Sequence, residues 1–176
     1  MPDRPNVLFV MTDQQRYDTI NALGNADIHT PNIDRLADRG VACTNAYTPA
    51  PICVPARHCV RTGSEPPTTG YWGNDKRDAA HLEDRCGPFL ARAMANRGYR
   101  TFGVGKFHTT PYDLDLGYET HLRRKQYEAD TGNDLSTALG RSDAMHLLPQ
   151  TNRYPPDETF AAWATDRGVD LIAEDD

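Results

Sequence analysis

Apolar and polar positions alternate in blocks along the chain, and these blocks predict strands and helices in turn. Residues 6–11, Asn-Val-Leu-Phe-Val-Met, form an apolar run of strand length, which is typical of a strand covered on both faces. Residues 41–47 and 99–104 predict two further strands. Polar groups follow the first and last runs, at 12–15 and 105–108. Open α/β sheets place their functional sites at such strand ends.

Between these strands the pattern changes to the period of a helix. Thr30 can cap a helix that Pro31 begins and Gly40 ends, which matches the usual start and stop signals. The remaining predicted helices cover residues 55–62, closed by Gly63, residues 88–97, followed by Gly98, and an amphipathic segment over 159–174.

Alternating strands and helices predict an α/β fold with a mostly parallel sheet and helices on both faces. The length of 176 residues fits a single domain. Residues 109–158 are polar, rich in proline and predicted to be irregular, like an insertion. The final helix has no strand after it to pair, so we expect a chain that is cut short at its C-terminus.

Composition narrows the possible functions. The chain has 19 Lys and Arg against 25 Asp and Glu, a net charge of −6, which argues against a nucleic-acid partner. No apolar run reaches the roughly 18 residues of a membrane span, and the first residues lack the pattern of a signal peptide. We therefore expect a cytoplasmic protein without a membrane partner.

The cysteines do not predict a zinc site or a disulfide framework. They are Cys43, Cys53, Cys59 and Cys86, and none forms a Cys-x-x-Cys pair. In a cytoplasmic chain they would stay reduced. Cys43, among small apolar residues, is best interpreted as a buried hydrophobe.

Cys53 differs because it lies at the expected start of a helix, with Arg57 one turn later. A helix N-terminus carries a partial positive charge and free N–H groups, which bind anions and stabilise a thiolate. The guanidinium of Arg57 matches sulfate or phosphate oxygens. These residues indicate an oxyanion site with a reactive sulfur, although a purely structural role for them is equally compatible with the spacing.

The motif Cys53-x-Pro55-x-Arg57, followed by Thr62-Gly63, resembles the signature of type I sulfatases, members of the alkaline-phosphatase-like superfamily. Three further segments are similar to that family in the family's order: residues 6–14, 29–37 and 98–108. The resemblance is best over residues 6–108, weak over 109–158, and returns in the last helix. It implies that residues 1–176 form the N-terminal part of a sulfatase catalytic domain.

The resemblance also implies an activity. Cys53 would be converted to formylglycine by a formylglycine-generating enzyme, and its hydrate would attack the sulfur of a sulfate monoester, carried by a small molecule or a glycan. Asp13, Gln14 and the modified Cys53 would hold a divalent cation, with Ca²⁺ favoured over Mg²⁺ or Mn²⁺. Arg57, Lys106 and His108 would complete the catalytic group, and Asn74 would touch the substrate.

The sequence departs from the family pattern in three places. Ala56 stands where serine is common, Arg61 where an apolar residue is usual, and Gln14 where many members have a second aspartate. Two alternatives stay open. Relatives with the same nucleophile cleave phosphonate or phosphate esters, and an inactive fragment could bind only a metal or an oxyanion.

Individually, the other candidate residues would also fit ordinary structural roles. Asp13 could cap a turn, Lys106 could be a solvated surface charge, and His108 could be a loop histidine. Their matched positions around one signature favour the site.

Overall fold

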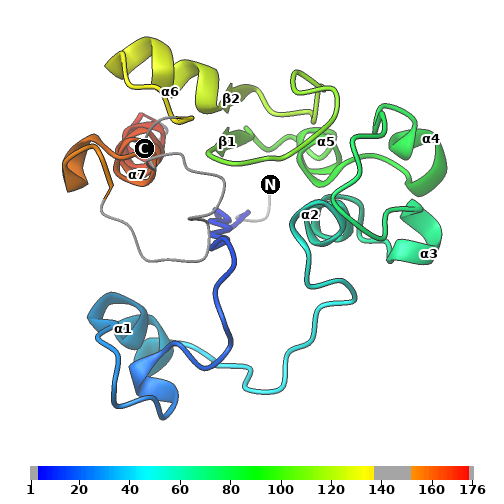
Figure 1. The fold of residues 1–176 in the computed structure, drawn as a ribbon. Coiled ribbons are helices and arrows are strands. Elements are labelled where there is room, and N and C mark those ends of the chain that lie inside the picture. The colour runs from blue at the N-terminus through cyan, green and yellow to red at the C-terminus, as the bar shows by residue number, and fades with distance from the viewer. Residues whose placement is uncertain (1–3, 137–151, 175–176) are drawn as a thin grey trace, which may run out of the picture.

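Two short parallel strands lie at the centre of the fold in the computed structural model, which describes residues 4–136 and 152–174. β1 (Phe102–Val104) pairs in parallel with β2 (Thr120–Leu122), and Gly103 lies opposite His121. Helices α5 (Leu90–Ala95) and α7 (Phe160–Ala173) lie on opposite sides of this pair in the view of Figure 1. The α/β class with a parallel sheet is confirmed.

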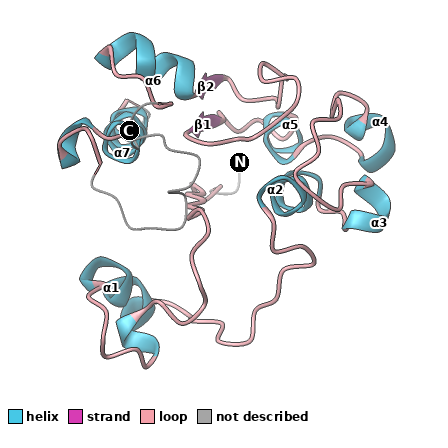
Figure 2. Cartoon of the chain, viewed as in Figure 1, coloured by secondary structure: helices cyan, strands magenta, loops and turns pink. Residues whose placement is uncertain are grey.

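Helices make up most of the remaining regular structure (Figure 2). They are α1 (Pro31–Arg39), α2 (Cys53–Thr62), α3 (Pro66–Thr69), α4 (Leu82–Cys86) and α6 (Arg124–Thr131), with 3-10 turns at Asn21–Leu23 and Pro156–Glu158. The predicted helices at 30–40, 55–62 and 159–174 are confirmed as α1, α2 and α7. The one predicted at 88–97 is confirmed as the shorter α5. Short α3 and α4 were not predicted.

The predicted strands at 6–11 and 41–47 are wrong. Both segments are irregular, and Val7, Leu8, Phe9, Val10 and Met11 are between 39% and 75% exposed. A strand needs a neighbouring backbone to receive its hydrogen bonds. Within the described residues neither segment has such a neighbour, so an apolar run alone does not become a strand. The strand predicted at 99–104 is confirmed, shortened to β1.

The prediction that residues 109–158 are irregular is also wrong in part, because the segment contains β2 and α6; its residues 137–151 lie outside the described residues. Parallel pairing with β1 orders β2. In α6, Tyr127 is fully buried, and its ring packs edge-on against Phe160 and Trp163 of α7 at 5.4 and 5.8 Å. Contacts from far along the chain therefore stabilise a helix whose own sequence shows little apolar pattern.

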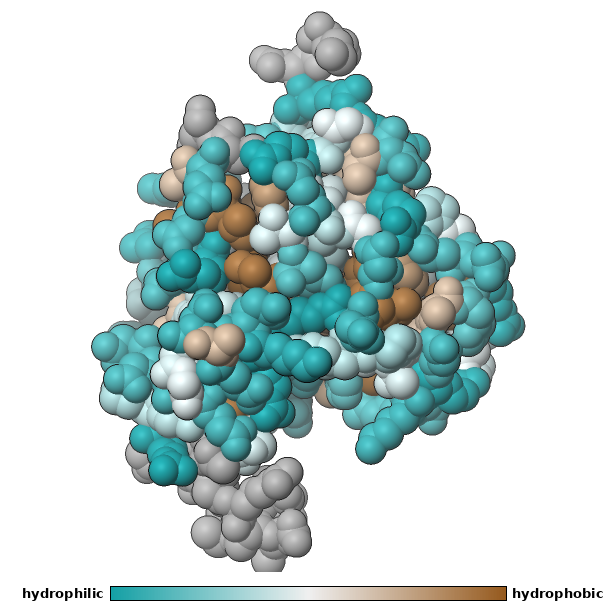
Figure 3. All heavy atoms as spheres, turned by 90° about the horizontal axis from the view of Figure 1, so that it is seen from above, coloured by the Kyte–Doolittle hydropathy of each residue, from teal (hydrophilic) through white to brown (hydrophobic). Residues whose placement is uncertain are grey.

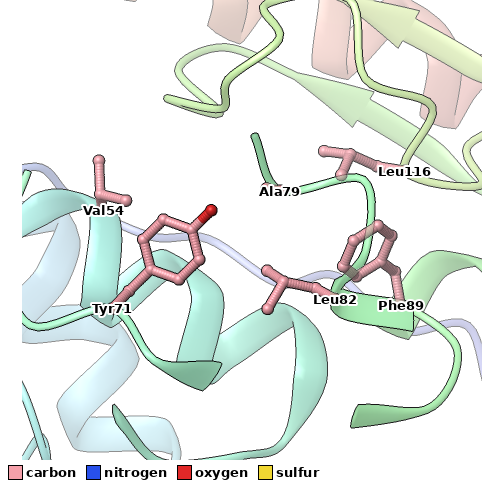
Figure 4. Close-up of a cluster of buried hydrophobic side chains, with 6 residues drawn as sticks. All are labelled: Val54, Tyr71, Ala79, Leu82, Phe89 and Leu116. Atoms are coloured by element: carbon pink, nitrogen blue, oxygen red, sulfur yellow. The ribbon is translucent and has the colours of Figure 1, made fainter. Parts of the chain in front are cut away.

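A cluster of buried side chains ties α2 to the segments around it (Figure 4). It comprises Val54, Tyr71, Ala79, Leu82, Phe89 and Leu116. The ring of Tyr71 points into this cluster, and its hydroxyl donates to the carbonyls of Arg77 and Asp78, both at 3.1 Å. Because Val54 directly follows Cys53, the core fixes the first turn of α2.

Much of the chain lies at the surface. It exposes 12628 Å², whereas a compact monomer of its mass would expose about 8,600 Å². The face in Figure 3 is mainly hydrophilic, with hydrophobic residues gathered in two places. A cavity of about 530 Å³ between Tyr17, Leu23 and Thr44 contains none of the predicted site residues. In the part that the structure describes, no helix has the length and apolar character needed to cross a membrane.

Candidate active site

Cys53 is the first residue of α2 and is half-buried. The next two residues, Val54 and Pro55, are buried in the core. Gly63 ends the helix with φ +67°, a left-handed conformation that glycine adopts without strain. The sequence therefore places the sulfur at a rigid helix N-terminus, where backbone N–H groups favour an anion.

A residue from a distant loop caps this helix. The N-cap position is Ile52, whose side chain cannot accept a hydrogen bond. The amide oxygen of Asn74 takes that role and accepts from the backbone N–H of Val54 at 3.0 Å. Asn74, predicted from the resemblance to touch substrate, thus lies beside the first turn of α2 and is itself exposed.

Asp13 lies between two cations that come from different parts of the chain. One carboxylate oxygen accepts from Arg57 Nη2 at 3.1 Å, and the other accepts from Lys106 Nζ at 2.8 Å. The Arg57 side chain is 9% exposed, whereas those of Lys106 and Asp13 are 41% and 46% exposed. The three side chains form a group in which Arg57 is buried in the protein, while Asp13 and Lys106 are accessible to solvent.

The charges of this group set the protonation state of Asp13. The hydrogen bond from Lys106 is the largest influence, and together with Arg57 it outweighs burial and holds the pKa of Asp13 below its ordinary value. Two cations against one carboxylate leave a net positive charge. Such a centre attracts a tetrahedral oxyanion.

His108 follows on the same loop, two residues after Lys106. It is exposed, and its backbone has φ +54°, a left-handed conformation that is uncommon for a residue with a side chain. Burial, followed by the charges of Lys106 and Arg57, lowers the pKa of His108. The imidazole is therefore neutral near pH 7 and can accept a proton.

The loop that carries Lys106 and His108 is held from two sides. The ring of Phe107 lies over Gly103, where an added Cβ would come within 2.9 Å of that ring. It also packs edge-on against His121 at 4.1 Å. From α2, Arg57 donates to the carbonyl of Lys106, and Arg61 donates to the carbonyl of Phe107 at 2.6 Å.

The bond from Arg61 to the Phe107 carbonyl was not predicted from the sequence. The sequence marked Arg61 only as a departure from the family's apolar residue. A signal was present in its spacing, because residues four apart lie on the same face of a helix, and Arg61 follows Arg57 by one turn.

The oxygen donors of the site suit a hard cation only in part. Asp13 supplies a carboxylate and Gln14 an amide oxygen. Both are exposed, and Gln14 has φ +54°. Ca²⁺ and Mg²⁺ take six or more oxygen ligands. Within residues 4–136 and 152–174, no three His, Cys, Asp or Glu side chains are grouped so that they could hold a metal ion. The described residues therefore fit part of a ligand set.

The four cysteines are free. Cys43 is exposed, so the prediction that it is a buried hydrophobe is wrong; it lies in the segment that does not form a strand. Cys59, on α2 with Cys53, is half-buried, and burial followed by the charge of Glu65 raises the pKa of its thiol. Of the two α2 cysteines, only Cys53 lies at the helix N-terminus.

Comparison with known proteins identifies the family of this chain. A sequence profile of the sulfatase family matches residues 5–173. A sulfatase of Formosa agariphila is 39% identical over 94% of this chain, and the uncharacterised sulfatase YidJ of Escherichia coli is 34% identical over 97%. The matched regions are 36% and 35% of those proteins, so the chain spans about a third of their length.

A solved structure is similar over the same region. The phosphonate monoester hydrolase of Agrobacterium radiobacter superposes with a TM-score of 0.73 at 26% identity, covering 98% of this chain and 39% of that one. The fold is therefore shared with an alkaline-phosphatase-like enzyme. With the profile match over nearly the whole chain, these likenesses show that the chain belongs to the sulfatase family.

Proposed function

We propose that the protein carrying this chain hydrolyses sulfate monoesters with a formylglycine made from Cys53. The observation that carries the proposal is that Asp13 pairs with both Arg57 and Lys106. Arg57 lies on the helix that begins at Cys53, and Lys106 lies on the loop that carries His108. Family membership supports the reaction class. The hydrated aldehyde supplies a nucleophilic hydroxyl that an unmodified thiol lacks.

The two cationic residues have different proposed roles. Arg57 is buried and fixed by its bonds to Asp13 and to the Lys106 carbonyl, so its guanidinium is preorganised to stabilise the hydrated formylglycine and the charges around it. Lys106 Nζ is more exposed and can leave Asp13 to contact an oxygen of the ester. Negative charge that develops in the transition state is balanced by both groups.

His108 and the oxygen donors complete the proposed roles. The neutral imidazole of His108 can take up a proton as the nucleophile reacts. Asp13 and Gln14 would hold a divalent cation; their oxygen donors suit Ca²⁺, Mg²⁺ and Mn²⁺, and the family resemblance favours Ca²⁺. Such a cation acts as a Lewis acid, and its further ligands would come from outside the described residues.

The first test is mass spectrometry of the peptide across Cys53 after co-expression with a formylglycine-generating enzyme. We expect a mass loss of about 18 Da at Cys53. Cys59, which lies on the same helix, is the internal control and should keep its thiol mass. An unmodified Cys53 would contradict the proposed nucleophile.

The second test is a side-by-side rate assay of an aryl sulfate and an aryl phosphonate monoester. We expect the sulfate to be the better substrate, with activity lost in Cys53→Ala and kept in Cys59→Ala. Phosphonate or phosphate ester hydrolysis is the second candidate, favoured by the structural likeness to a phosphonate monoester hydrolase. Oxyanion binding without turnover of either ester would identify an inactive protein.

A further inference from the structure

Helix α2 sends two arginines to one short loop. Arg57 Nη1 donates to the carbonyl of Lys106, and Arg61 Nη2 donates to the carbonyl of Phe107 at 2.6 Å. The two arginines are one helical turn apart and lie on the same face. Consecutive peptide groups of the loop are thus each held by a guanidinium, and the second peptide is the one that leads into His108.

The loop needs such anchors because it has no regular structure of its own. It follows β1 as an irregular segment, with Gly105 at φ +111° and His108 at φ +54°. A left-handed backbone at a residue with a side chain persists only when its surroundings hold it. The N–H of Gly105 is fixed by the carbonyl of Leu122 at 2.9 Å, so Arg61 supplies the anchor nearest to His108.

Burying the charged side chain of Arg61 lowers the stability of the fold relative to an apolar side chain at this position. Burial, with the charges of Arg57 and Arg123 nearby, lowers the pKa of Arg61 to about 10. Its Nη1 is buried without a hydrogen-bond partner in the described part of the chain. An apolar side chain would pack in this position without taking a charge out of water. What the guanidinium adds is the bond to the Phe107 carbonyl.

We propose that Arg61 is a positioning residue, which orients Lys106 and His108 by holding the carbonyl of Phe107. This inference rests on the proposed function for its effect on catalysis. In the part of the chain that the structure describes, no hydrogen bond or ion pair joins Arg61 to Asp13 or to Cys53. Its effect therefore passes through the backbone of the loop.

Amide hydrogen exchange on the full chain tests the positioning without any assay of activity. In Arg61→Met, which keeps an unbranched side chain, we expect the peptide over residues 105–110 to exchange about tenfold faster or more. Exchange in α2 and α5 should stay unchanged, and the midpoint of thermal unfolding should equal or exceed that of the wild type. Arg39→Met, at an exposed arginine of α1, is the charge-matched control and should change neither.

Kinetics with the hydrolysed ester provide the second readout. In Arg61→Met we expect kcat to fall by about 10- to 100-fold, the effect of a small displacement of catalytic groups. KM should change by less than about threefold. Added guanidinium ion should recover part of the lost kcat in Arg61→Ala, where it can occupy the vacated space, and should have no such effect on Arg39→Met.

Unchanged exchange over residues 105–110 together with an unchanged kcat in Arg61→Met would overturn the proposal. Faster exchange throughout the chain with a lower unfolding midpoint would also overturn it, since that result identifies a general structural role. If the wild type hydrolyses neither ester, the proposed function fails. The local exchange result then still decides whether Arg61 orders the loop.

Discussion

The amide oxygen of Asn74 lies 3.0 Å from the backbone nitrogen of Val54 and accepts its hydrogen bond. The helix that begins at Cys53 is therefore capped by a loop residue that follows it in the sequence, because Ile52 at the cap position has no side-chain acceptor. The observed cap and the proposed substrate contact would be two separate roles of Asn74, and substitutions can separate them.

Replacing Asn74 should distinguish these two roles. Asn74→Ala removes the cap and should lower the free energy of unfolding by about 1 kcal/mol. Asn74→Asp keeps an acceptor and should restore stability, yet its negative charge should raise KM for an anionic ester about tenfold. Urea unfolding and steady-state kinetics measure the two effects. Asp75→Ala in the same loop is the control, and equal stability of Asn74→Ala and the wild type would contradict the capping role.

The ion pairs of Asp13 predict a dependence of stability on pH. The hydrogen bond from Lys106 is the main cause that lowers the pKa of Asp13 in the folded chain, and Arg57 lowers it further. Its contribution is full above the unfolded pKa of 3.8 and is lost as pH falls through the lower folded value. Because the carboxylate is half-exposed, it contributes at most about 1 kcal/mol. The difference in unfolding free energy between the wild type and Asp13→Asn should therefore hold from pH 7 to 5 and shrink below pH 4. A difference that grows toward low pH would contradict this.

Removal of divalent cations should lower hydrolysis, and Ca²⁺ should restore it. Asp13 is the charged oxygen donor of the proposed cation site. In Asp13→Asn the Ca²⁺ concentration for half-maximal recovery after chelation should rise about tenfold or more. Asp38→Asn, at an exposed carboxylate of α1, should respond like the wild type. Equal Ca²⁺ requirements in the two variants would remove Asp13 from the ligand set.

His58 should make the chain less stable in mild acid. Its ring is 1% exposed, packs 4.2 Å from the ring of Tyr71, and has a pKa lowered by burial to about 3. An unfolded histidine binds a proton near pH 6.5, so stability is full above that value and falls as pH drops toward 3. Between pH 7 and 5 this group should cost about 2 kcal/mol of unfolding free energy.

The comparison of His58→Phe with the wild type at both pH values measures this contribution. The variant keeps a ring against Tyr71 and should lose about 2 kcal/mol less on acidification. His29→Gln, at an exposed histidine, should lose as much as the wild type. The prediction is wrong if His58→Phe and the wild type lose stability in parallel.

Tyr127 should be a main contact that holds α6 on α7. It is fully buried, and its hydroxyl donates to the carbonyl of Glu158 at 2.9 Å. Tyr127→Ala should lower the free energy of unfolding by about 3–5 kcal/mol, as large aromatic truncations do. Tyr127→Phe removes only the hydrogen bond and should cost about 1 kcal/mol. Urea unfolding measures the free energy of unfolding of both variants. Equal decreases in the two variants would show that packing of the ring is not the main source of stability.

The sequence predicted those elements whose signals are local. Pro31 and Gly40 bound α1, and Gly63 follows α2, so each helix carries its own start or stop signal. The strand predicted from the apolar run at residues 6–11 is absent from the described structure, because strand formation depends on a partner elsewhere in the chain. For the same reason α6 was missed, since Tyr127 gains its stability from α7.

In the candidate site, too, local motifs were predicted from the sequence, whereas contacts between distant residues were not. Family motifs selected Cys53, Arg57 and Lys106, and the structure brings Arg57 and Lys106 together at Asp13, 93 residues before Lys106. Spacing along the chain could not show which oxygen meets which cation. The contact of Arg61 was not predicted because a charged residue on a helix usually faces water, and only the fold reveals its bond to the Phe107 carbonyl.

The exposed run at residues 6–11 has a consequence for the chain in concentrated solution. It joins β-branched and aromatic residues without charge or proline, the composition of segments that stack between chains as cross-β aggregates. Its apolar side chains already face solvent. Two copies can therefore form between them the strand pairs that this segment lacks within the described part of one copy. We therefore expect the time for which the chain stays in solution to shorten as its concentration rises at a fixed temperature.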